Sequence, residues 1–291
     1  MTGPPRISVV IPTRKRSALL RRALASVEAQ TRKVEEIVVV DDASTDDTAV
    51  LIDECVKRGM LITCVRNPRP LGGAGARNRG VAAARGDHIA FLDDDDDWLP
   101  EKIQRQIALI EDTGSAVVTC GWRFAGRPGD RGIRSHFVPP AVITPGNNLP
   151  KCVMGGCSGV VVRRTVFDEV GGFDERLPCL QDYDLWQRLL LKAPARAVRE
   201  VLYNYRVNDD IARISNNLEA QLRGLSLFYD KHSWMMTPSQ QRYFRSKPLE
   251  LQYFFEHNTW KKYGYLWRAL LGAPTGRFRW FVGQHLRLVG F

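Results

Sequence analysis

One stretch of the sequence decides which fold we predict: Ile89-Ala90-Phe91-Leu92-Asp93-Asp94-Asp95-Asp96-Asp97. Its four apolar residues form a buried strand, and the five carboxylates follow directly where that strand ends. Adjacent carboxylates repel one another, so the run costs stability unless a positive group neutralises it. A solvated acidic turn is one interpretation. We favour a divalent-cation site, because hard oxygen ligands suit Mg²⁺ or Mn²⁺.

Three further apolar runs precede this strand and alternate with helical patterns. These runs are Ile7–Ile11, Ile37–Val40 and Leu61–Val65. Such an order of continuous β-branched strands and helices predicts an α/β fold with a mostly parallel sheet flanked by helices. Ligands bind at the carboxyl ends of the strands in such sheets, so Thr13-Arg14, Asp41-Asp42 and the aspartate run should meet at one edge.

The geometry of an extended strand also predicts how the aspartates are paired. Alternate residues point the same way, so we expect Asp93 and Asp95 to form one pair and Asp94 and Asp96 another. Further along, residues 126–150 are rich in Gly, Pro and Arg and are expected to form a long loop over the site.

The composition is that of a globular protein. The 291 residues are 44% hydrophobic and 25% charged, which excludes disorder for most of the chain. No apolar run approaches the roughly 18–20 residues of a membrane-spanning helix, and the first run is too short for a signal peptide, so we expect a cytoplasmic protein. The six cysteines form no CxxC pair, which argues against structural zinc.

Charge and aromatic content divide the chain into two regions. The formal net charge is +10, and residues 216–291 hold 11 basic and 4 acidic residues, or +7 of it. The same segment contains 16 of the 27 aromatic residues. We therefore expect one domain at residues 1–215 and a basic, aromatic, helical C-terminal extension at residues 216–291.

Six motifs in the first region, taken together and in order, resemble those of family 2 glycosyltransferases. They are Ile7-Ser8-Val9-Val10-Ile11-Pro12-Thr13, Val39-Val40-Asp41-Asp42-Ala43-Ser44, Ala76-Arg77-Asn78-Arg79-Gly80, Phe91-Leu92-Asp93-Asp94-Asp95, Gly171-Gly172-Phe173-Asp174-Glu175 and Gln181-Asp182-Tyr183-Asp184-Leu185-Trp186. The resemblance implies a GT-A fold, a nucleoside-diphosphate sugar as donor (a UDP-sugar being expected), a divalent metal and inversion at the anomeric carbon.

The resemblance also implies roles for residues at the donor site. Asp42 would contact the nucleotide base, and Asp93 and Asp95 would hold Mn²⁺ or Mg²⁺. The residues expected to bind the nucleotide sugar are Pro12, Thr13, Arg14, Asp42, Arg77, Asp93 and Asp94.

On the acceptor side, the resemblance makes Asp182 the catalytic base. Gln181 stands where the family usually has glutamate, and Gly156 and Cys157 would lie near the acceptor with it. A helix N-cap is the structural alternative for Asp182, and a carboxylate at a helix N-terminus is expected to have a low pKa.

One motif of the family is incomplete. A histidine that often follows the next strand is absent, because the chain reads Tyr205-Arg206-Val207-Asn208. Arg206 and Arg213 are then candidates for contact with the diphosphate, and a surface salt bridge is the alternative for each.

The segment Thr259–Phe291 contains six Lys or Arg residues, no acidic residue and many aromatics. Two interpretations stay open. The segment could bind an anionic membrane surface, placing the protein peripherally on the inner face of a membrane, or its aromatics could pack onto the catalytic domain. Nothing in it matches a known nucleic-acid module, so we expect no nucleic-acid partner.

The sequence thus predicts a metal-dependent inverting glycosyltransferase that moves a sugar to a hydroxyl of a glycan or lipid-linked acceptor in polysaccharide or cell-envelope biosynthesis. A nucleotidyltransferase is the rival enzyme, but its first loop would be glycine-rich, and Thr13-Arg14-Lys15-Arg16 has no glycine. A catalytically inactive sugar-nucleotide or lipid-binding module is the other rival, and such a module would not need Asp182.

Overall fold

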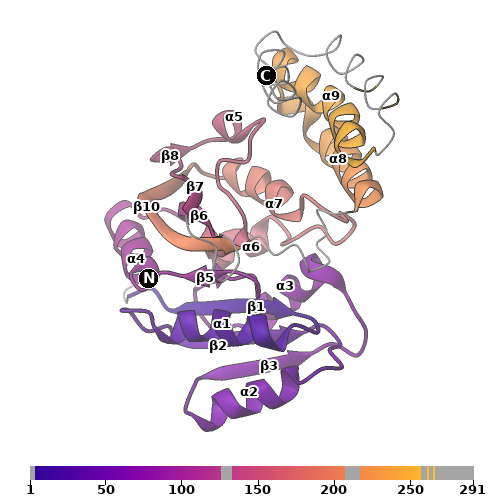
Figure 1. Ribbon diagram of the computed structural model, residues 1–291. Coiled ribbons are helices and arrows are strands. Elements are labelled where there is room, and N and C mark those ends of the chain that lie inside the picture. The colour runs from indigo at the N-terminus through magenta and orange to yellow at the C-terminus, as the bar shows by residue number, and fades with distance from the viewer. Residues whose placement is uncertain (1–3, 126–132, 207–216, 257–260, 262–264, 266–291) are drawn as a thin grey trace. The chain divides into compact units, whose positions relative to one another are not determined.

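The computed structural model describes residues 4–125, 133–206, 217–256, 261 and 265 (Figure 1). The chain divides into two compact units. The first comprises Met1–Asn148, Cys152–Glu175 and Gln181–Ile211, and the second comprises Leu149–Lys151, Arg176–Leu180 and Ala212–Phe291. The domain boundary expected at 215/216 stays a prediction.

The first unit begins with four parallel strands that alternate with helices. The strands are β1 (Ile7–Thr13), β2 (Glu36–Asp41), β3 (Ile62–Arg66) and β4 (His88–Phe91), and they lie in the order β3-β2-β1-β4. The helices between them are α1 (Ser17–Glu28), α2 (Thr48–Lys57) and α3 (Gly72–Ala83). The predicted α/β fold is confirmed, and the carboxyl ends of these strands form one edge of the sheet.

The sheet continues beyond β4 with strands of both directions. In order these are β9 (Val161–Arg163), β6 (Val117–Ala125), β10 (Ala195–Arg206) and β5 (Asp97–Trp98). β9 runs antiparallel to β4 and β6, whereas β6 and β10 are parallel. The sheet is therefore parallel in its first half and mixed as a whole.

The segment expected to be a long loop is largely regular, so that expectation is wrong for its described part. β7 (Ile133–Phe137) pairs with β6 as an antiparallel hairpin, and β8 (Val142–Ile143) pairs with β10. A short helix, α5 (Pro145–Asn148), follows. Backbone pairing with β6 and β10 outweighs the loop preference that the Gly, Pro and Arg content of this segment indicates. Residues 126–132 lie outside the described residues.

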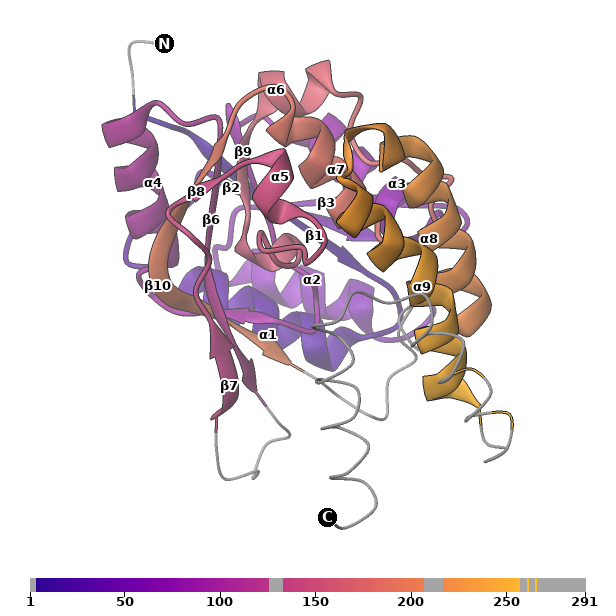
Figure 2. The same cartoon turned by 90° about the horizontal axis from the view of Figure 1, so that it is seen from above.

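Helices cover both faces of the sheet, as Figure 2 shows from above. Alternate residues of β1 belong to two different hydrophobic cores. Val9 lies in the core that includes residues of α1, α2 and α4 (Lys102–Thr113). Val10 lies in the core that includes residues of α3, α6 (Arg164–Glu169) and α7 (Gln181–Leu190). This alternation is the period of two that a strand buried on both faces requires. The two cores fix the sheet, and so fix the edge where the polar residues gather.

The second unit is mainly helical over residues 217–256. α8 (Leu218–His232) and α9 (Pro238–Phe255) are joined by the 3₁₀ turn η3 (Ser233–Met235). Thr237 and Gln240 form a capping box at the start of α9, and the rings of Phe228 and Phe244 stack between the helices at 5.3 Å. No helix among the described residues has the length and apolar character needed to cross a bilayer.

Gly80 of α3 provides a test of how tightly this helix packs on the sheet. A Cβ at this position would collide with the Val10 side chain and lie 3.0 Å from Val40 Cγ2. We expect Gly80→Ala to lower the free energy of unfolding by about 1–3 kcal/mol in urea denaturation, because the helix must move off β1 and β2.

Gly146→Ala in α5 is the matched control. A Cβ there would meet no atom within 4 Å, so its unfolding free energy should stay within about 0.5 kcal/mol of the parent protein. If both variants lose the same free energy of unfolding, Gly80 is not needed for the close packing of α3 against the sheet.

Candidate active site

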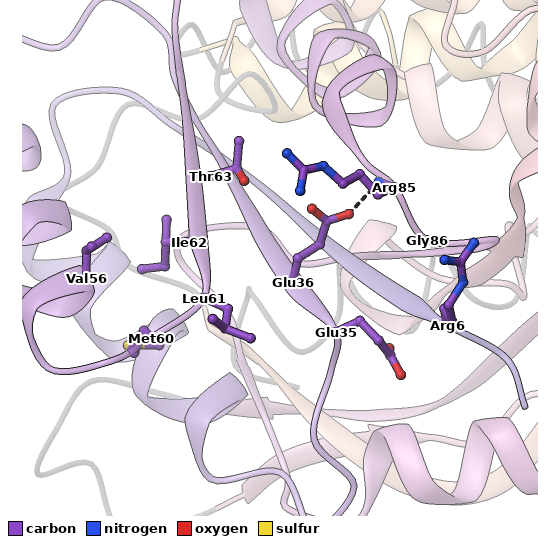
Figure 3. A pocket seen from close by; sticks show the side chains of 10 residues that line it. All are labelled: Arg6, Glu35, Glu36, Val56, Met60, Leu61, Ile62, Thr63, Arg85 and Gly86. Carbon is purple, nitrogen blue, oxygen red and sulfur yellow. Dashed lines mark hydrogen bonds between the residues drawn. The ribbon is translucent and has the colours of Figure 1, made fainter.

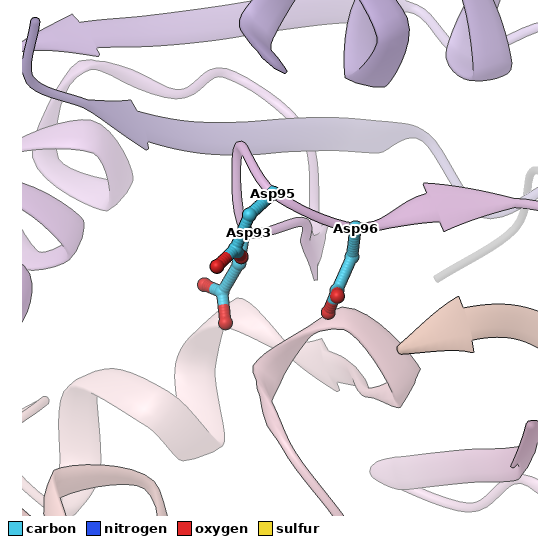
Figure 4. A group of neighbouring side chains, drawn as sticks. All are labelled: Asp93, Asp95 and Asp96. Carbon is cyan, nitrogen blue, oxygen red and sulfur yellow. The ribbon is translucent and has the colours of Figure 1, made fainter. Parts of the chain in front are cut away.

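Three of the five aspartates after β4 form an acidic cluster. Carboxylate oxygens of Asp93, Asp95 and Asp96 lie within 4.8 Å of one another, and Figure 4 shows their side chains gathered in one region. The expected pairing of Asp93 with Asp95 agrees with this group, but the pairing of Asp94 with Asp96 is wrong. The backbone turns here, with Asp96 N–H bonded to Asp93 O at 3.1 Å, so the alternation of an extended strand no longer applies.

Asp94 is buried and ties the aspartate turn to the end of β1. Its carboxylate accepts hydrogen bonds from Thr13 Oγ1 at 2.8 Å and from the Arg16 guanidinium at 3.2 Å. Burial raises the pKa of Asp94 to about 6, although Arg16 and Thr13 oppose that shift. Thr13 therefore lies at the acidic edge as predicted, but it binds Asp94 in this structure.

Asp96 faces the protein interior. It accepts hydrogen bonds from Ser158 Oγ at 2.6 Å and from the Arg206 backbone N–H at 3.0 Å. Burial raises its pKa well above the usual value, and the negative charges of Asp95 and Asp93 add to the shift. A bound cation would relieve this concentration of charge.

Asp97 has a different environment from the cluster. Asn204 Nδ2 and Arg206 Nε of β10 both donate to its carboxylate, and Arg22 Nε lies 3.5 Å away. Asp97 thus joins β5 to β10. Arg206 was a candidate either for contact with the diphosphate or for a salt bridge, and in this structure it forms a salt bridge with Asp97. Arg213, the other candidate, lies outside the described residues.

The donor atoms of the acidic cluster fit a hard divalent cation. Three carboxylates from one short turn supply the oxygen ligands that Mg²⁺ and Mn²⁺ prefer. Asp93 and Asp95 are partly exposed, so they are open to a ligand on the solvent side, while Asp96 is buried behind them.

Arg77 of α3 links this cluster to the acceptor side. Its guanidinium donates to Asp93 Oδ1 at 2.5 Å and lies 5.5 Å from the centre of the Phe173 ring. Burial would lower the pKa of Arg77, but Asp93, Cys157 and Asp182 together outweigh burial and raise that pKa. A Cβ on Gly73 would lie 2.9 Å from Arg77 Nη1 and 3.3 Å from Gln181 Oε1, so Gly73 is what lets these side chains come together.

Asp182 lies in the first turn of α7. Its Oδ1 accepts the Tyr183 backbone N–H at 2.8 Å, one of the first-turn N–H groups that have no partner within the helix. The expected low pKa is wrong: desolvation by the surrounding protein raises the pKa of Asp182, outweighing Tyr183 and Arg77, which lower it. The charges of Arg77 and Asp93 both act on Asp182, so the structure brings these three predicted residues together.

The other acceptor-side residues lie just before β9. Gly156 precedes a 3₁₀ turn, η1 (Cys157–Gly159), and a Cβ on it would meet no atom within 4 Å. Cys157 is buried, and burial raises the pKa of its thiol well above the usual range. Arg77, Asp93 and Asp182 all interact electrostatically with that thiol.

Asp42 is buried at the end of β2 and fixes the start of α3. Its carboxylate accepts hydrogen bonds from Asn67 Nδ2 and Leu71 N at 2.8 Å and from Gly72 N at 3.0 Å. Beside it is a cavity of about 420 Å³ whose lining residues are Ala43, Ser44, Thr45, Arg66, Asn67 and Pro68. Of the remaining donor-side predictions, Pro12 lies in β1 opposite Val40, and Arg14 is exposed.

A second cavity, of about 580 Å³, lies away from this edge (Figure 3). It is lined at the amino ends of β1, β2 and β3 by residues that include Arg6, Glu36, Leu61 and Arg85, and Glu36 accepts a hydrogen bond from the Arg85 backbone. Ligands of such sheets bind at the opposite, carboxyl edge, so this cavity is not part of the candidate site.

Sequence reasoning missed two residues that organise the site. Ser158 holds both Asp96 and the backbone N–H of Asp93, at 3.1 Å. Asn78 donates to Phe173 O and Glu175 Oε1 and accepts from Phe173 N, all at 2.9 Å, so it joins two of the six motifs. The position of Asn78 inside a quoted motif was a signal for it. Ser158 lies in the loop Gly155–Gly159, which the family resemblance places near the acceptor, but nothing in the sequence links it to the aspartates.

The candidate site thus combines a mixed sheet, an aspartate turn after β4 and a carboxylate in the first turn of α7. The profile described as glycosyl transferase family 2 matches residues 8–171, and that described as glycosyltransferase-like family 2 matches residues 128–265. The chain belongs to glycosyltransferase family 2.

Two curated relatives illustrate the match. The chain is 32% identical over 240 residues to the Escherichia coli UDP-Glc:alpha-D-GlcNAc-diphosphoundecaprenol beta-1,3-glucosyltransferase WfaP, covering 77% of this chain and 91% of WfaP. It is 29% identical over 227 residues to a glycosyltransferase of Rickettsia felis, covering 74% of this chain. The match spans only 36% of that Rickettsia protein's length, and 62% of the length of a relative from Haemophilus influenzae.

Solved structures agree on the fold. TarS residues 1–349 of S. aureus, in complex with UDP-GlcNAc, match with a TM-score of 0.68 at 18% identity, covering 92% of this chain and 82% of that one. The mannosyltransferase PcManGT of Pyrobaculum calidifontis, in complex with GDP-Man and Mn²⁺, matches with a TM-score of 0.64 at 18% identity, covering 98% and 85%. The GT-A fold predicted from the sequence is confirmed.

The helix that carries Asp182 is held by a buried ion pair, which can be tested. Arg188 donates to Asp184 Oδ2 at 2.7 and 2.9 Å and to Val170 O at 2.7 Å, and Asp184 is fully buried. We expect Arg188→Met to lower the free energy of unfolding by about 3–5 kcal/mol in denaturant titration, because it removes the positive charge that is paired with a fully buried carboxylate.

Arg21→Met is the control, since Arg21 pairs with Glu54 at 3.1 Å where both side chains are more than half exposed. Its loss should be below about 1 kcal/mol. If Arg188→Met is as mild as the control, the ion pair does not hold α7.

Proposed function

We propose that this family 2 glycosyltransferase is a metal-dependent, inverting enzyme that moves a sugar from a UDP-sugar to a hydroxyl of a glycan or lipid-linked acceptor. The observation that carries the proposal is the acidic cluster Asp93, Asp95 and Asp96, with Arg77 and Asp182 beside it. The arrangement has the parts that the reaction needs: a place for a cation and diphosphate, and a separate carboxylate to accept a proton.

The names of similar proteins support the choice of substrates. WfaP is named for a UDP-Glc donor and a diphosphoundecaprenol-linked acceptor, and TarS was solved with UDP-GlcNAc. An Erwinia amylovora relative, 39% identical over 106 residues, is named for amylovoran biosynthesis. We therefore place the reaction in polysaccharide or cell-envelope biosynthesis.

In this proposal Asp93 and Asp95 hold Mn²⁺ or Mg²⁺, and Asp96 completes the acidic group. When bound, the cation would supply positive charge to the nucleoside diphosphate that leaves. PcManGT, which shares the fold, was solved with Mn²⁺.

The chain's own residues would do the remaining work. Arg77 lies against Asp93 and adds a fixed positive charge beside the leaving diphosphate. Asp182 would remove the proton from the acceptor hydroxyl, and its raised pKa makes it a better proton acceptor than an ordinary carboxylate. Gly156, Cys157 and Gln181 would form the acceptor side.

The nucleotide would occupy the carboxyl ends of β1 and β2. Pro12 and Thr13 end β1 and Arg14 follows it, while Asp42 accepts a hydrogen bond from Asn67, which lines the cavity of about 420 Å³ where the base would lie. Asp94 would act there by keeping the aspartate turn attached to Thr13.

The chain's organisation and location complete the proposal. Residues 1–215 would form the catalytic domain and residues 216–291 the extension, whose segment 259–291 would meet an anionic membrane surface on the cytoplasmic side. Of that segment only Lys261 and Tyr265 are among the described residues. No nucleic-acid partner is proposed.

Asp182→Asn separates proton transfer from binding. Asparagine keeps the shape and can accept the Tyr183 N–H, but it cannot take a proton at neutral pH. We expect sugar transfer to fall at least about 100-fold in a radiolabelled-donor assay, with donor affinity and thermal midpoint unchanged. A variant with near-normal turnover would reduce Asp182 to a capping residue.

The acidic cluster predicts which aspartate controls the metal. Asp95→Asn should raise the Mn²⁺ concentration needed for half-maximal activity at least about tenfold, since it removes a ligand. Asp97→Asn is the matched control: it breaks contacts to Arg206 and Asn204, so it should lower the thermal midpoint and leave the Mn²⁺ requirement unchanged. Equal metal requirements in the two variants would contradict the assignment.

A further inference from the structure

Lys102, in the first turn of α4, is fully buried beside the candidate site. Among the residues that the structure describes, no carboxylate pairs with its ammonium group. Nζ instead donates to Gln106 Oε1 at 2.7 Å and lies 4.0 Å from the centre of a Trp98 ring. Lysine is almost never fully buried without a charged partner, so this position calls for an explanation.

Stability does not explain this lysine. Burial lowers the pKa of Lys102 to about 8, which shows that the protein interior disfavours its charged form. Replacing buried charges by apolar residues of similar volume is often neutral or stabilising. Retention of a costly group usually marks a functional requirement.

The contacts of Lys102 lead to the acidic cluster by two routes. Gln106 Nε2 donates to Gly159 O at 2.8 Å, and Trp98 Nε1 donates to Ser158 O at 2.8 Å. Ser158 Oγ in turn donates to Asp96 at 2.6 Å and accepts the Asp93 backbone N–H at 3.1 Å. The segment Ser158-Gly159 is therefore fixed from behind by two groups that both touch Lys102.

We propose that Lys102 is a positioning residue for the metal site, acting through Gln106 and Trp98 on the Ser158-Gly159 segment that holds Asp93 and Asp96. This role rests on the proposed function, because it needs the acidic cluster to bind a cation.

The chemistry of the contacts explains why a lysine is required. An ammonium group only donates, so it fixes the Gln106 amide with its oxygen toward Lys102 and its NH₂ toward Gly159 O. The same charge over the indole face holds the Trp98 ring in the plane that lets its N–H reach Ser158 O. An apolar side chain at position 102 would fill the space but would leave Gln106 Oε1 without its donor and the Trp98 ring without its cation.

The test compares Mn²⁺ binding and stability in Lys102→Met, Gln106→Met and the double variant. Free Mn²⁺ is measured by electron paramagnetic resonance in the presence of UDP, and thermal midpoints by circular dichroism. We expect each single variant to bind Mn²⁺ about tenfold more weakly, the size of effect typical of groups that orient metal ligands. The double variant should bind no more weakly than Lys102→Met, because Gln106 lies on one of the two routes by which Lys102 acts.

Gln187→Met is the matched control. Gln187 is also fully buried, and both of its amide atoms lack a hydrogen-bond partner in the described part of the chain, so no hydrogen bond joins it to Ser158 or Gly159 there. It should bind Mn²⁺ as the parent protein does. Thermal midpoints of the Lys102 and Gln187 variants should equal or exceed that of the parent.

Three outcomes would overturn the positioning role. The first is an Mn²⁺ affinity within twofold of the parent protein's in both single variants. The second is weaker Mn²⁺ binding together with a thermal midpoint below that of Gln187→Met. If Lys102→Met does not fold, Lys102 is a stability residue, and Gln106→Met alone then shows whether Gly159 matters. Failure of the parent protein itself to bind Mn²⁺ would instead overturn the proposed metal site.

Discussion

Like-charge repulsion at the end of β4 is the constraint on which the rest of the site depends. Five consecutive aspartates cannot share one direction without a large cost, so the backbone turns and sends their side chains to different partners. Four of them pair with an arginine: Asp93 with Arg77, Asp94 and Asp95 with Arg16, and Asp97 with Arg206. These arginines come from α3, the loop after β1 and the end of β10, so neutralising the run also joins distant parts of the fold.

The remaining charge is concentrated where chemistry would use it. Burial raises the pKa of Asp94, Asp96 and Asp182 alike, which shows that protein has replaced water around this edge. In such surroundings a cation at Asp93 and Asp95 would act on a diphosphate with little screening. The buried Lys102 also serves this site, because its charge orients the side chains of Gln106 and Trp98 and does not neutralise a carboxylate.

The sequence predicts the sheet edge well and the side-chain contacts poorly. Buried strands with Asp42 and the aspartate run at their ends are local signals, so their meeting follows from parallel topology alone. The turn after β4 depends on Ser158 and β10, which are distant in sequence, so the wrong pairing of Asp94 with Asp96 could not be avoided. The low pKa expected for Asp182 used a local rule about helix ends, whereas desolvation is a property of the folded protein.

Anomalous X-ray diffraction from a crystal of the protein grown with Mn²⁺ and UDP tests the central claim most directly. The account predicts one manganese peak within about 2.0–2.6 Å of carboxylate oxygens of Asp93 or Asp95, the range of metal–oxygen bonds to such cations, with the diphosphate on its solvent side. A manganese peak bound by other residues, or UDP bound at this edge with no manganese near the aspartates, would contradict it.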